Sequence, residues 1–331
     1  MSESRILYLF TRTPLHVGAG SSVGAIDQPI VRERHTGFPV IPASSLKGTF
    51  ADAWNGGLEE EASDRGETHK VRVKEDGTAS DAAWLFGSDS DKHPAAGALQ
   101  FSEAKLLAFP IRSARGSFAW ITCPLMLRRA VRDGAIPAAK LERLTEPADD
   151  KAIFDTTANS KLALGDNVVL EEYTFQAATP TWLGLSNLGE HLAGLPPADE
   201  VWKEIASRLV ILSDGMMSFF AQNACEVAQH VRISDETGAA AGGALFNQEN
   251  VPGETLFFAV LNVFNGRGDK FKGKTPDQAL RAFLGQDDQG KDQPSKPGVR
   301  NRSVFQFGGD ASTGLGYCTV GLDSEKKEVL K

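Results

Sequence analysis

Glycines and a single acid dominate residues 16–28, HVGAGSSVGAIDQ. Gly18, Gly20 and Gly24 allow the backbone to adopt positive φ and to approach a ligand closely. Asp27 follows these glycines and is the one carboxylate of the segment. The pattern predicts a pliable loop that presents an acid, and a carboxylate in that position can accept a proton or help to bind a cation.

A second group of chemically useful residues lies at the start of a predicted helix. Ser44 and Ser45 are favoured N-cap residues. Apolar residues then recur every fourth position, at Leu46, Phe50 and Trp54. Lys47 therefore falls in the first helical turn, where unpaired amides and the helix dipole attract phosphate. Together with Asp27, these residues predict a phosphate site that faces a carboxylate.

Structural explanations of the same residues remain open. A glycine-rich run is often an ordinary loop, and an aspartate before Gln-Pro is typical of an Asx-turn or a cap. Lys47 can equally be a solvated surface residue. Local chemistry alone does not separate these readings from a functional site.

The elements that must position these residues are short strands. Residues 5–11 alternate, with Ile6, Tyr8 and Phe10 on one side, and predict a first strand that ends at Pro14. Residues 29–33 and 38–41 flank a Thr-Gly turn and predict a hairpin with Asp27 at its mouth.

Two runs of this region resemble a known family. Residues 24–33, GAIDQPIVRE, and 36–48, TGFPVIPASSLKG, are similar to the RAMP superfamily of CRISPR proteins and, more narrowly, to the backbone subunits of type III-B (Cmr) complexes. In that family the acid of the D-x-P-I-x-R-E segment is needed for target-RNA cleavage. The resemblance therefore implies that Asp27 is catalytic.

The family's S-S-L-K-G segment contacts guide RNA. The matching positions, for which the resemblance implies guide-RNA binding, are Ser44, Ser45, Lys47 and Gly48. Ala43 departs from the family pattern, because a glycine is common there. The usual nearby arginine is also missing after Thr49-Phe50.

The middle of the chain carries two further segments that resemble the family. Residues 109–113, FPIRS, match its central pattern, and Arg112 could touch phosphate or form a salt-bridged loop. Residues 226–233 alternate, which predicts His230 and Arg232 on one face and the apolar residues Val227, Val231 and Ile233 facing inward. In the family a hairpin here wedges the guide–target duplex open, so we expect Arg232 to contact RNA.

A glycine-rich loop near the C-terminus also resembles RAMP proteins, in which such a loop packs beside guide RNA. Its glycines, all expected at the RNA, are Gly308, Gly309, Gly314 and Gly316. A simple hairpin turn would need fewer glycines. His16, at the end of the first predicted strand, could face the same RNA or be a hydrogen-bonded structural histidine.

One motif favours a different function. Residues 268–275, GDKFKGKT, satisfy G-x-x-x-x-G-K-[ST], the pattern of a P-loop nucleotide hydrolase. A P-loop domain builds a parallel sheet from strands that follow the loop, and too few residues follow Thr275 to supply one. We expect a basic loop near RNA instead.

Charge and cysteine content limit the function classes. The net charge of −8 disfavours nucleic acid, yet residues 146–200 hold ten acids against two bases, whereas residues 264–302 hold nine bases against five acids. Basic grooves are therefore compatible with an acidic chain. No apolar run is long enough to span a bilayer, there is no signal-peptide pattern, and the three cysteines lack zinc spacing, so a cytoplasmic protein with reduced thiols is expected.

These patterns predict an α+β fold with an RRM-like (ferredoxin-like) core of the RAMP type and large insertions. We expect a single domain over residues 1–331, with the core at about 1–56, 81–135 and 253–331 and insertions at about 57–80 and 136–252. The second insertion should contain a thumb-like hairpin.

The resemblance implies a guide-RNA-binding subunit that stacks in several copies, assembles with other Cmr subunits and cleaves target RNA at regular intervals. Since a lone aspartate binds Mg²⁺ poorly, we expect Mg²⁺ to be shared transiently between Asp27 and a target phosphate, with no organic cofactor. A non-catalytic architectural RNA-binding subunit is the alternative, followed by the nucleotide hydrolase.

Overall fold

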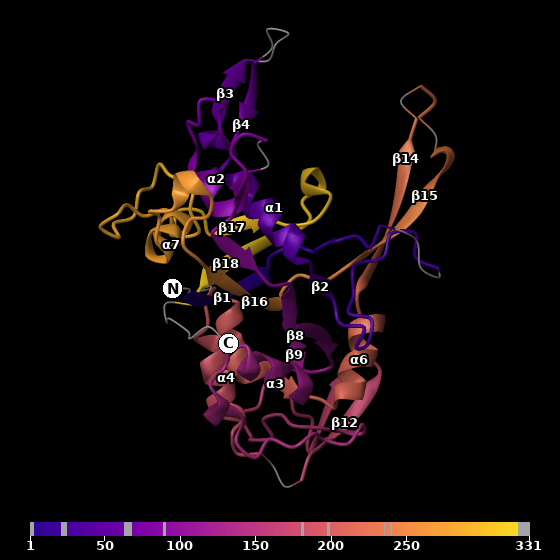
Figure 1. Cartoon of the computed structure of the whole chain (residues 1–331). Coiled ribbons are helices and arrows are strands. Elements are labelled where there is room, and N and C mark those ends of the chain that lie inside the picture. Colours follow the sequence, from indigo (N-terminus) through magenta and orange to yellow (C-terminus); the bar gives the residue numbers. More distant parts are fainter. Residues whose placement is uncertain are drawn as a thin grey trace.

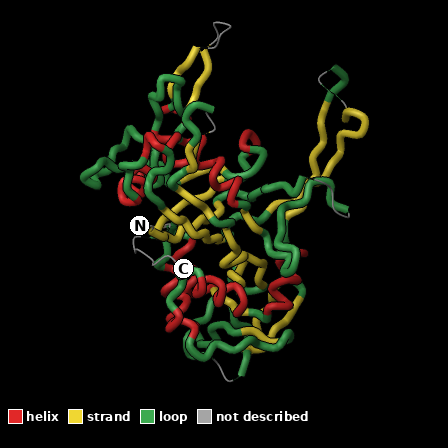
Figure 2. The backbone as a smooth tube through the Cα atoms, viewed as in Figure 1, coloured by secondary structure: helices red, strands yellow, loops and turns green. Residues whose placement is uncertain are grey.

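The computed structural model describes residues 3–20, 25–62, 68–88, 91–179, 182–196, 199–234, 236–238 and 240–323. A mixed twelve-stranded sheet forms the centre of the molecule (Figures 1 and 2). Its strands are β1 (Glu3–Thr11), β2 (Val40–Ile41), β7 (Leu99–Phe101), β8 (Ala104–Ser113), β9 (Ser117–Thr122), β10 (Lys151–Ala152), β11 (Asn167–Leu170), β12 (Tyr173–Ala177), β13 (Leu209–Ile211), β16 (Leu256–Val263), β17 (Val304–Gln306) and β18 (Tyr317–Leu322).

Three separate strand pairs and seven α-helices complete the described fold. The pairs are β3 (Glu59–Ala62) with β4 (Thr68–Val71), β5 (Gly87–Ser88) with β6 (Ala95–Ala96), and β14 (Glu226–Ile233) with β15 (Ala240–Asn250). The helices are α1 (Ala43–Ala53), α2 (Asp81–Phe86), α3 (Pro124–Arg132), α4 (Leu185–Ala193), α5 (Ile205–Arg208), α6 (Asp214–Asn223) and α7 (Pro276–Leu284). The α+β class predicted from the sequence is confirmed.

The four central strands lie in the order β8, β16, β1, β18, and each is antiparallel to its neighbours. Along the chain, α1 lies between β1 and β8, and α7 lies between β16 and β18. The predicted alternation of β1 is present, and both faces are buried: Tyr8 belongs to one apolar cluster and Leu7 to the other. Buried apolar layers on both sides therefore hold the central strands.

Aromatic residues fix α1 against the sheet. Phe50 packs on Phe101, Phe283, Phe305 and Phe307, with ring centroids 5.0–5.6 Å apart. Leu46 and Trp54, the other residues of the predicted stripe, are also buried. The helix prediction is confirmed, but the capping prediction is wrong. Pro42 is the N-cap, without a side-chain hydrogen bond, and Ser44 and Ser45 lie inside the helix.

The hairpin formed by β14 and β15 projects from the body of the molecule (Figure 1). The expected inward orientation of its apolar residues is wrong, because Val227, Val231 and Ile233 are 53, 49 and 52% exposed. A two-stranded ribbon has no second layer against which to bury one face. His230 stacks on Phe246 across the pair, with centroids 5.1 Å apart.

Other helix predictions have mixed outcomes. The sequence predicts a helix over residues 125–133, and α3 confirms it. Asp199 as a cap and the spacing of Trp202, Ile205 and Leu209 predict a helix through Leu209. The structure has only a 3-10 turn, Trp202–Glu204, and the four residues of α5, after which Leu209 begins β13. The polar segment 57–80 contains the pair β3 and β4. Within the described ranges, no helix has the length and apolar character needed to cross a membrane.

The P-loop-like segment does not form a phosphate cradle. The backbone N–H groups of Phe271 and Lys274 donate to the carbonyls of Gly268 and Phe271, so these amides are already used. Thr275 caps α7 through a capping box with Gln278. The preceding strand, β16, lies between antiparallel neighbours. These features disfavour the nucleotide-binding alternative.

Candidate nucleic-acid interface

Asp27 is exposed and is fixed to strand β15. Its backbone N–H donates to Oδ1 of Asn247 at 2.7 Å, and its Oδ2 accepts from the backbone N–H of Asn247 at 2.9 Å. The Asn247 side chain also donates to the carbonyl of Ala25 at 3.0 Å. No hydrogen bond to Asp27 Oδ1 is found among the described residues, so one carboxylate oxygen is open to a ligand.

The glycine-rich loop predicted before Asp27 lies only partly within the described residues. Gly20 has a φ of +85°, as expected for a residue that turns the chain. Gly24 lies outside the described residues. The segment is further ordered by pairing, because Ala19 donates to the carbonyl of Pro29 and Val31 donates to that of Val17. The predicted hairpin is also present, since Glu33 donates to the carbonyl of Phe38.

Glu249 fixes the same loop from the interior. Its Oε2 accepts from the backbone N–H of Ile30 at 3.1 Å, and its Oε1 accepts from Nη2 of Arg32 at 2.5 Å. Glu249 is only 3% exposed. Two residues of β15, Asn247 and Glu249, thus contact the segment that follows Asp27. Their alternate spacing puts both on one side of the strand, but this spacing does not indicate which segment that side contacts.

His16 is nearly buried at the junction of the loop and β15. Its Nδ1 lies 2.7 Å from the carbonyl oxygen of Glu249. Because a carbonyl only accepts, Nδ1 carries the proton of this hydrogen bond. The hydrogen-bonded structural role considered from the sequence is therefore present, and RNA contact by His16 stays a prediction.

The C-terminal glycine loop closes against His16. Gly308 has a φ of +75°, and a Cβ there would lie 2.0 Å from the carbonyl oxygen of His16. Gly316 has a φ of +79°, and a Cβ there would lie 1.9 Å from the carbonyl oxygen of Phe307. Side chains are excluded at both positions. Gly309 donates its N–H to the His16 carbonyl at 2.9 Å, whereas Gly314 faces open space.

A polar contact joins the glycine loop to β15. Gln248 Nε2 donates to Asp310 Oδ2 at 2.6 Å and to Gln28 Oε1 at 3.4 Å. Helix α1 is adjacent to the same loop, because Thr49 Oγ1 donates to the carbonyl of Gln306 at 3.3 Å. The structure thus connects three separate segments, the Asp27 loop, β15 and the glycine loop, and places α1 beside the last of them.

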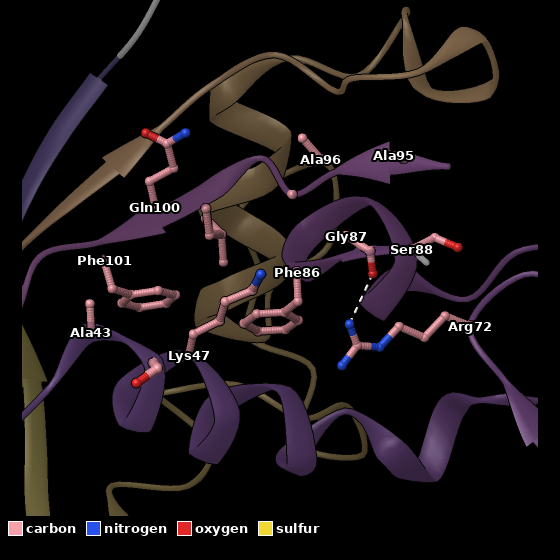
Figure 3. Close-up of a pocket in the computed structure, with 13 residues that line it drawn as sticks. Ala43, Lys47, Arg72, Phe86, Gly87, Ser88, Ala95, Ala96, Gln100 and Phe101 are labelled. Carbon is pink, nitrogen blue, oxygen red and sulfur yellow. Dashed lines mark hydrogen bonds between the residues drawn. The ribbon is translucent and has the colours of Figure 1, made fainter. Parts of the chain in front are cut away.

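The start of α1 borders a cavity of about 650 Å³ (Figure 3). Ser44 and Lys47 line it, and both are exposed. None of the side-chain hydrogen bonds and ion pairs found among the described residues involves Lys47. Gly48 is exposed and has no heavy atom within 4 Å of the position that a Cβ would occupy, whereas Ser45 is half-buried. Three of the four predicted guide contacts are therefore accessible.

Two predicted RNA contacts lie elsewhere. Arg112 forms ion pairs with Glu171 at 2.5 Å and Glu172 at 3.1 Å, between β11 and β12. This is the salt-bridged alternative that the sequence left open, and phosphate contact by Arg112 stays a prediction. Position 232 belongs to β14 of the projecting hairpin, but the side chain of Arg232 lies outside the described part of the structure.

Few groups in the described ranges could hold a metal or act as a nucleophile. No cluster of three or more His, Cys, Asp or Glu side chains suited to a metal ion is found there. Burial raises the pKa of the Cys225 thiol to about 11 and also raises the pKa values of Cys123 and Cys318. These thiols are therefore protonated at neutral pH. Asp27 and Asp310 are both exposed acids of the interface, and Asp310 accepts a hydrogen bond from Gln248.

Comparison with known proteins gives concordant matches. The profile of the RAMP superfamily matches residues 9–319. The CRISPR system Cmr endoribonuclease Cmr4 of Pyrococcus furiosus is 30% identical over 97% of this chain and 96% of its own length. The CRISPR system Cms endoribonuclease Csm3 of Mycobacterium tuberculosis is 27% identical over 70% of this chain and 86% of its own length.

Solved structures share the fold. Oligomeric Cmr4 from Pyrococcus furiosus matches with a TM-score of 0.61 and 24% identity, covering 97% of this chain and 98% of that one. A chain of the type III-B Cmr-beta complex bound to cognate target RNA matches with a TM-score of 0.60 and 18% identity, covering 97% of both chains.

Proposed function

Because this chain belongs to the RAMP superfamily, we propose that it is a guide-RNA-binding backbone subunit of a type III-B CRISPR complex that cleaves target RNA at regular intervals. One observation supports the catalytic part most directly. Asp27 is exposed, is held by Asn247 through two hydrogen bonds, and has one carboxylate oxygen without a described partner. A fixed acid with an open oxygen can act on a bound ribose-phosphate link.

An RRM-like (ferredoxin-like) core is part of the proposal. The antiparallel order β8, β16, β1, β18, with α1 and α7 as the two crossover helices, supports it. RRM domains bind single-stranded RNA on the sheet and its loops. In this arrangement, α1 and the glycine loop lie next to one another and can border one RNA path.

Guide RNA would be held chiefly through its phosphates. Lys47 is exposed, and none of the described residues that line the cavity with it is acidic. Neutralising phosphates with lysine or arginine gives sequence-independent affinity that falls as salt rises. Such binding suits a subunit that must accept guides of any sequence, and base pairing with the guide would select the target.

The proposed reaction is an attack by a 2′-hydroxyl of the target RNA on its neighbouring phosphate. The 2′-oxygen forms a bond to phosphorus, the bond from phosphorus to the 5′-oxygen of the next nucleotide breaks, and that oxygen takes up a proton. An ordinary aspartate, with a pKa of about 3.9, is a weak base. We therefore assign most of the effect to holding the ribose in line, with Asp27 orienting the hydroxyl and accepting its proton.

Asp27 also fits a Mg²⁺ ion that is shared with a target phosphate. Mg²⁺ usually keeps several waters and binds through one or two carboxylates together with substrate phosphates. The open oxygen of Asp27 matches that limited protein contribution. When bound, the ion would neutralise charge on the phosphate. The position of Asp27 would determine which phosphate of the target shares the ion.

Regular cleavage follows if several copies stack along one guide RNA. A head-to-tail contact repeats without closing, so each copy would present its own Asp27 at a constant spacing. Other Cmr subunits would complete the complex, and as part of such a complex the protein would work in the cytoplasm. The projecting hairpin β14–β15 is an element that can reach beyond its own copy (Figure 1).

Reconstitution tests this proposal. The chain is assembled with guide RNA and partner Cmr subunits, and an end-labelled complementary RNA is followed on a sequencing gel in Mg²⁺. We expect evenly spaced products that are absent with a non-complementary RNA. Binding of complementary RNA without any cleavage would instead establish the purely architectural alternative.

A further inference from the structure

The cavity beside Lys47 lies between α1 and the β5–β6 pair (Figure 3). We infer that it binds one nucleotide unit of the guide RNA, with its phosphate at Lys47 and Arg72 and its base on Phe101. This inference rests on the proposed function, because it takes guide RNA as the ligand that passes α1. It adds a base-binding pocket in which Arg72 and Phe101, outside the family-like motifs, act together with Lys47, which belongs to one of them.

Charge in the cavity favours a phosphate. Lys47 and Arg72 are the two charged residues of its lining, and none of the described lining residues is acidic. Figure 3 shows the two side chains entering the cavity from different walls. Arg72 Nη1 donates to the carbonyl of Gly87 at 2.9 Å, which fixes the guanidinium and leaves its other nitrogens for a ligand.

An aromatic surface in the cavity can stack the base of the nucleotide. Phe101 is half-buried, lines the cavity, and stacks on Phe50 with centroids 5.3 Å apart and an interplanar angle of 16°. Phe86 also lines the cavity, and in Figure 3 the Lys47 side chain lies between it and Phe101. An aromatic ring that is supported from behind can stack a base of any identity, which suits a guide-binding subunit.

Small residues keep the cavity open. The wall formed by β5 and β6 consists of Gly87, Ser88, Ala95 and Ala96, and Gly97 follows β6 in the same wall. A Cβ at Gly97 would lie 2.7 Å from the carbonyl oxygen of Leu85, so a side chain there would displace the wall. The volume of about 650 Å³ is in the range of pockets that bind small organic molecules, about 300–1,000 Å³.

Two substitutions and a matched control test the pocket. Phe101→Leu removes the stacking surface, and Arg72→Gln removes the charge but keeps a donor for Gly87. Phe118→Leu is the control, because Phe118 is also half-buried and packs on an aromatic residue, Trp120, but does not line the cavity. Thermal unfolding midpoints verify that each full-length variant folds.

Binding of labelled single-stranded RNA is measured by fluorescence anisotropy over a salt series. We expect Phe101→Leu to weaken binding about tenfold, and Arg72→Gln to weaken it and to lower the log–log salt slope by about one. Phe118→Leu should bind as the native chain does. RNA that contains 5-iodouracil should crosslink to Phe101 on irradiation.

Other outcomes overturn the inference. If Phe101→Leu and Arg72→Gln bind RNA as Phe118→Leu does, the pocket does not hold the guide, while RNA binding by the native chain keeps the proposed function intact. If the variants lose binding of free AMP in equilibrium dialysis but keep RNA affinity, the pocket serves a free nucleotide. If the native chain binds no RNA, the proposed function fails as well.

Discussion

Asp27 and Asn247 hold each other through reciprocal hydrogen bonds, in which the backbone N–H of each residue donates to a side-chain oxygen of the other, at 2.7 and 2.9 Å. The two residues are 220 positions apart in the chain. The acid at the tip of the N-terminal loop is therefore positioned by β15, the strand that also forms the projecting hairpin. Any movement of the hairpin base would move the acid.

Asn247→Ala tests this coupling. The substitution removes the side-chain contacts to Asp27 and Ala25 but keeps the backbone N–H that Asp27 accepts. We expect target cleavage to fall about tenfold, because a misplaced group loses much of its effect, while the affinity for guide RNA stays the same. The free energy of unfolding should fall by about 1 kcal/mol or less. Unchanged cleavage would show that the side chain of Asn247 does not position Asp27 for the reaction.

The Arg32–Glu249 pair gives a prediction about stability. Its atoms are 2.5 Å apart, and the side chains are 19 and 5% exposed. Glu249→Gln should lower the free energy of unfolding by about 3 kcal/mol, because it leaves a charge largely buried without its partner. Glu171→Gln, in the exposed pair with Arg112, should cost less than about 1 kcal/mol. Equal losses in urea titrations would contradict this assignment.

Glu254 makes stability depend on pH in the opposite sense to a paired acid. Burial raises its pKa above the ordinary 4.5, and Asp199 adds to the effect. Ionising Glu254 at neutral pH therefore destabilises the folded chain, and this effect disappears as the pH falls below the raised pKa. Glu254→Gln should raise the free energy of unfolding at pH 7 and have little effect on it near pH 4. Glu60→Gln, at an exposed position, should leave the free energy of unfolding unchanged at both pH values. Urea titrations at the two pH values measure the difference.

Thr275→Ala separates a helix cap from a nucleotide site. Thr275 accepts from the N–H of Gln278, and Gln278 Oε1 accepts from the N–H of Thr275 at 3.0 Å. Loss of this capping box should cost about 1 kcal/mol of unfolding free energy. ATP with Mg²⁺ should leave the melting temperature of the native chain unchanged. A melting temperature that rises with ATP and loses that rise in Lys274→Ala would revive the nucleotide hydrolase.

The sequence predicted local elements and the first strands well, because these follow from periodicity and turn residues. Alternation of apolar residues predicted the strand that contains Tyr8. Apolar residues at every fourth position predicted the buried stripe of Leu46, Phe50 and Trp54. The sequence did not indicate that Pro42 is the N-cap of α1. The preference of serine for N-cap positions suggested a later start, whereas the helix begins at Ala43 without a side-chain cap.

The sequence could not predict which residues form contacts with distant parts of the chain. Nothing local links Asn247 to Asp27 or Glu249 to Arg32, because these contacts depend on how β15 returns to the N-terminal loop. The exposed valines of β14 were misjudged for a similar reason. Alternation shows which residues share a face, but only the three-dimensional arrangement shows whether another layer covers that face.

Asp27→Asn tests the central claim most directly. Asparagine can still accept the hydrogen bond from the N–H of Asn247, so the loop should keep its position while the negative charge is lost. The reconstituted complex should bind guide and target RNA as before, and target cleavage should fall at least about 100-fold. Cleavage at the native rate, or a loss of target binding, would contradict the assignment of Asp27 as the catalytic carboxylate.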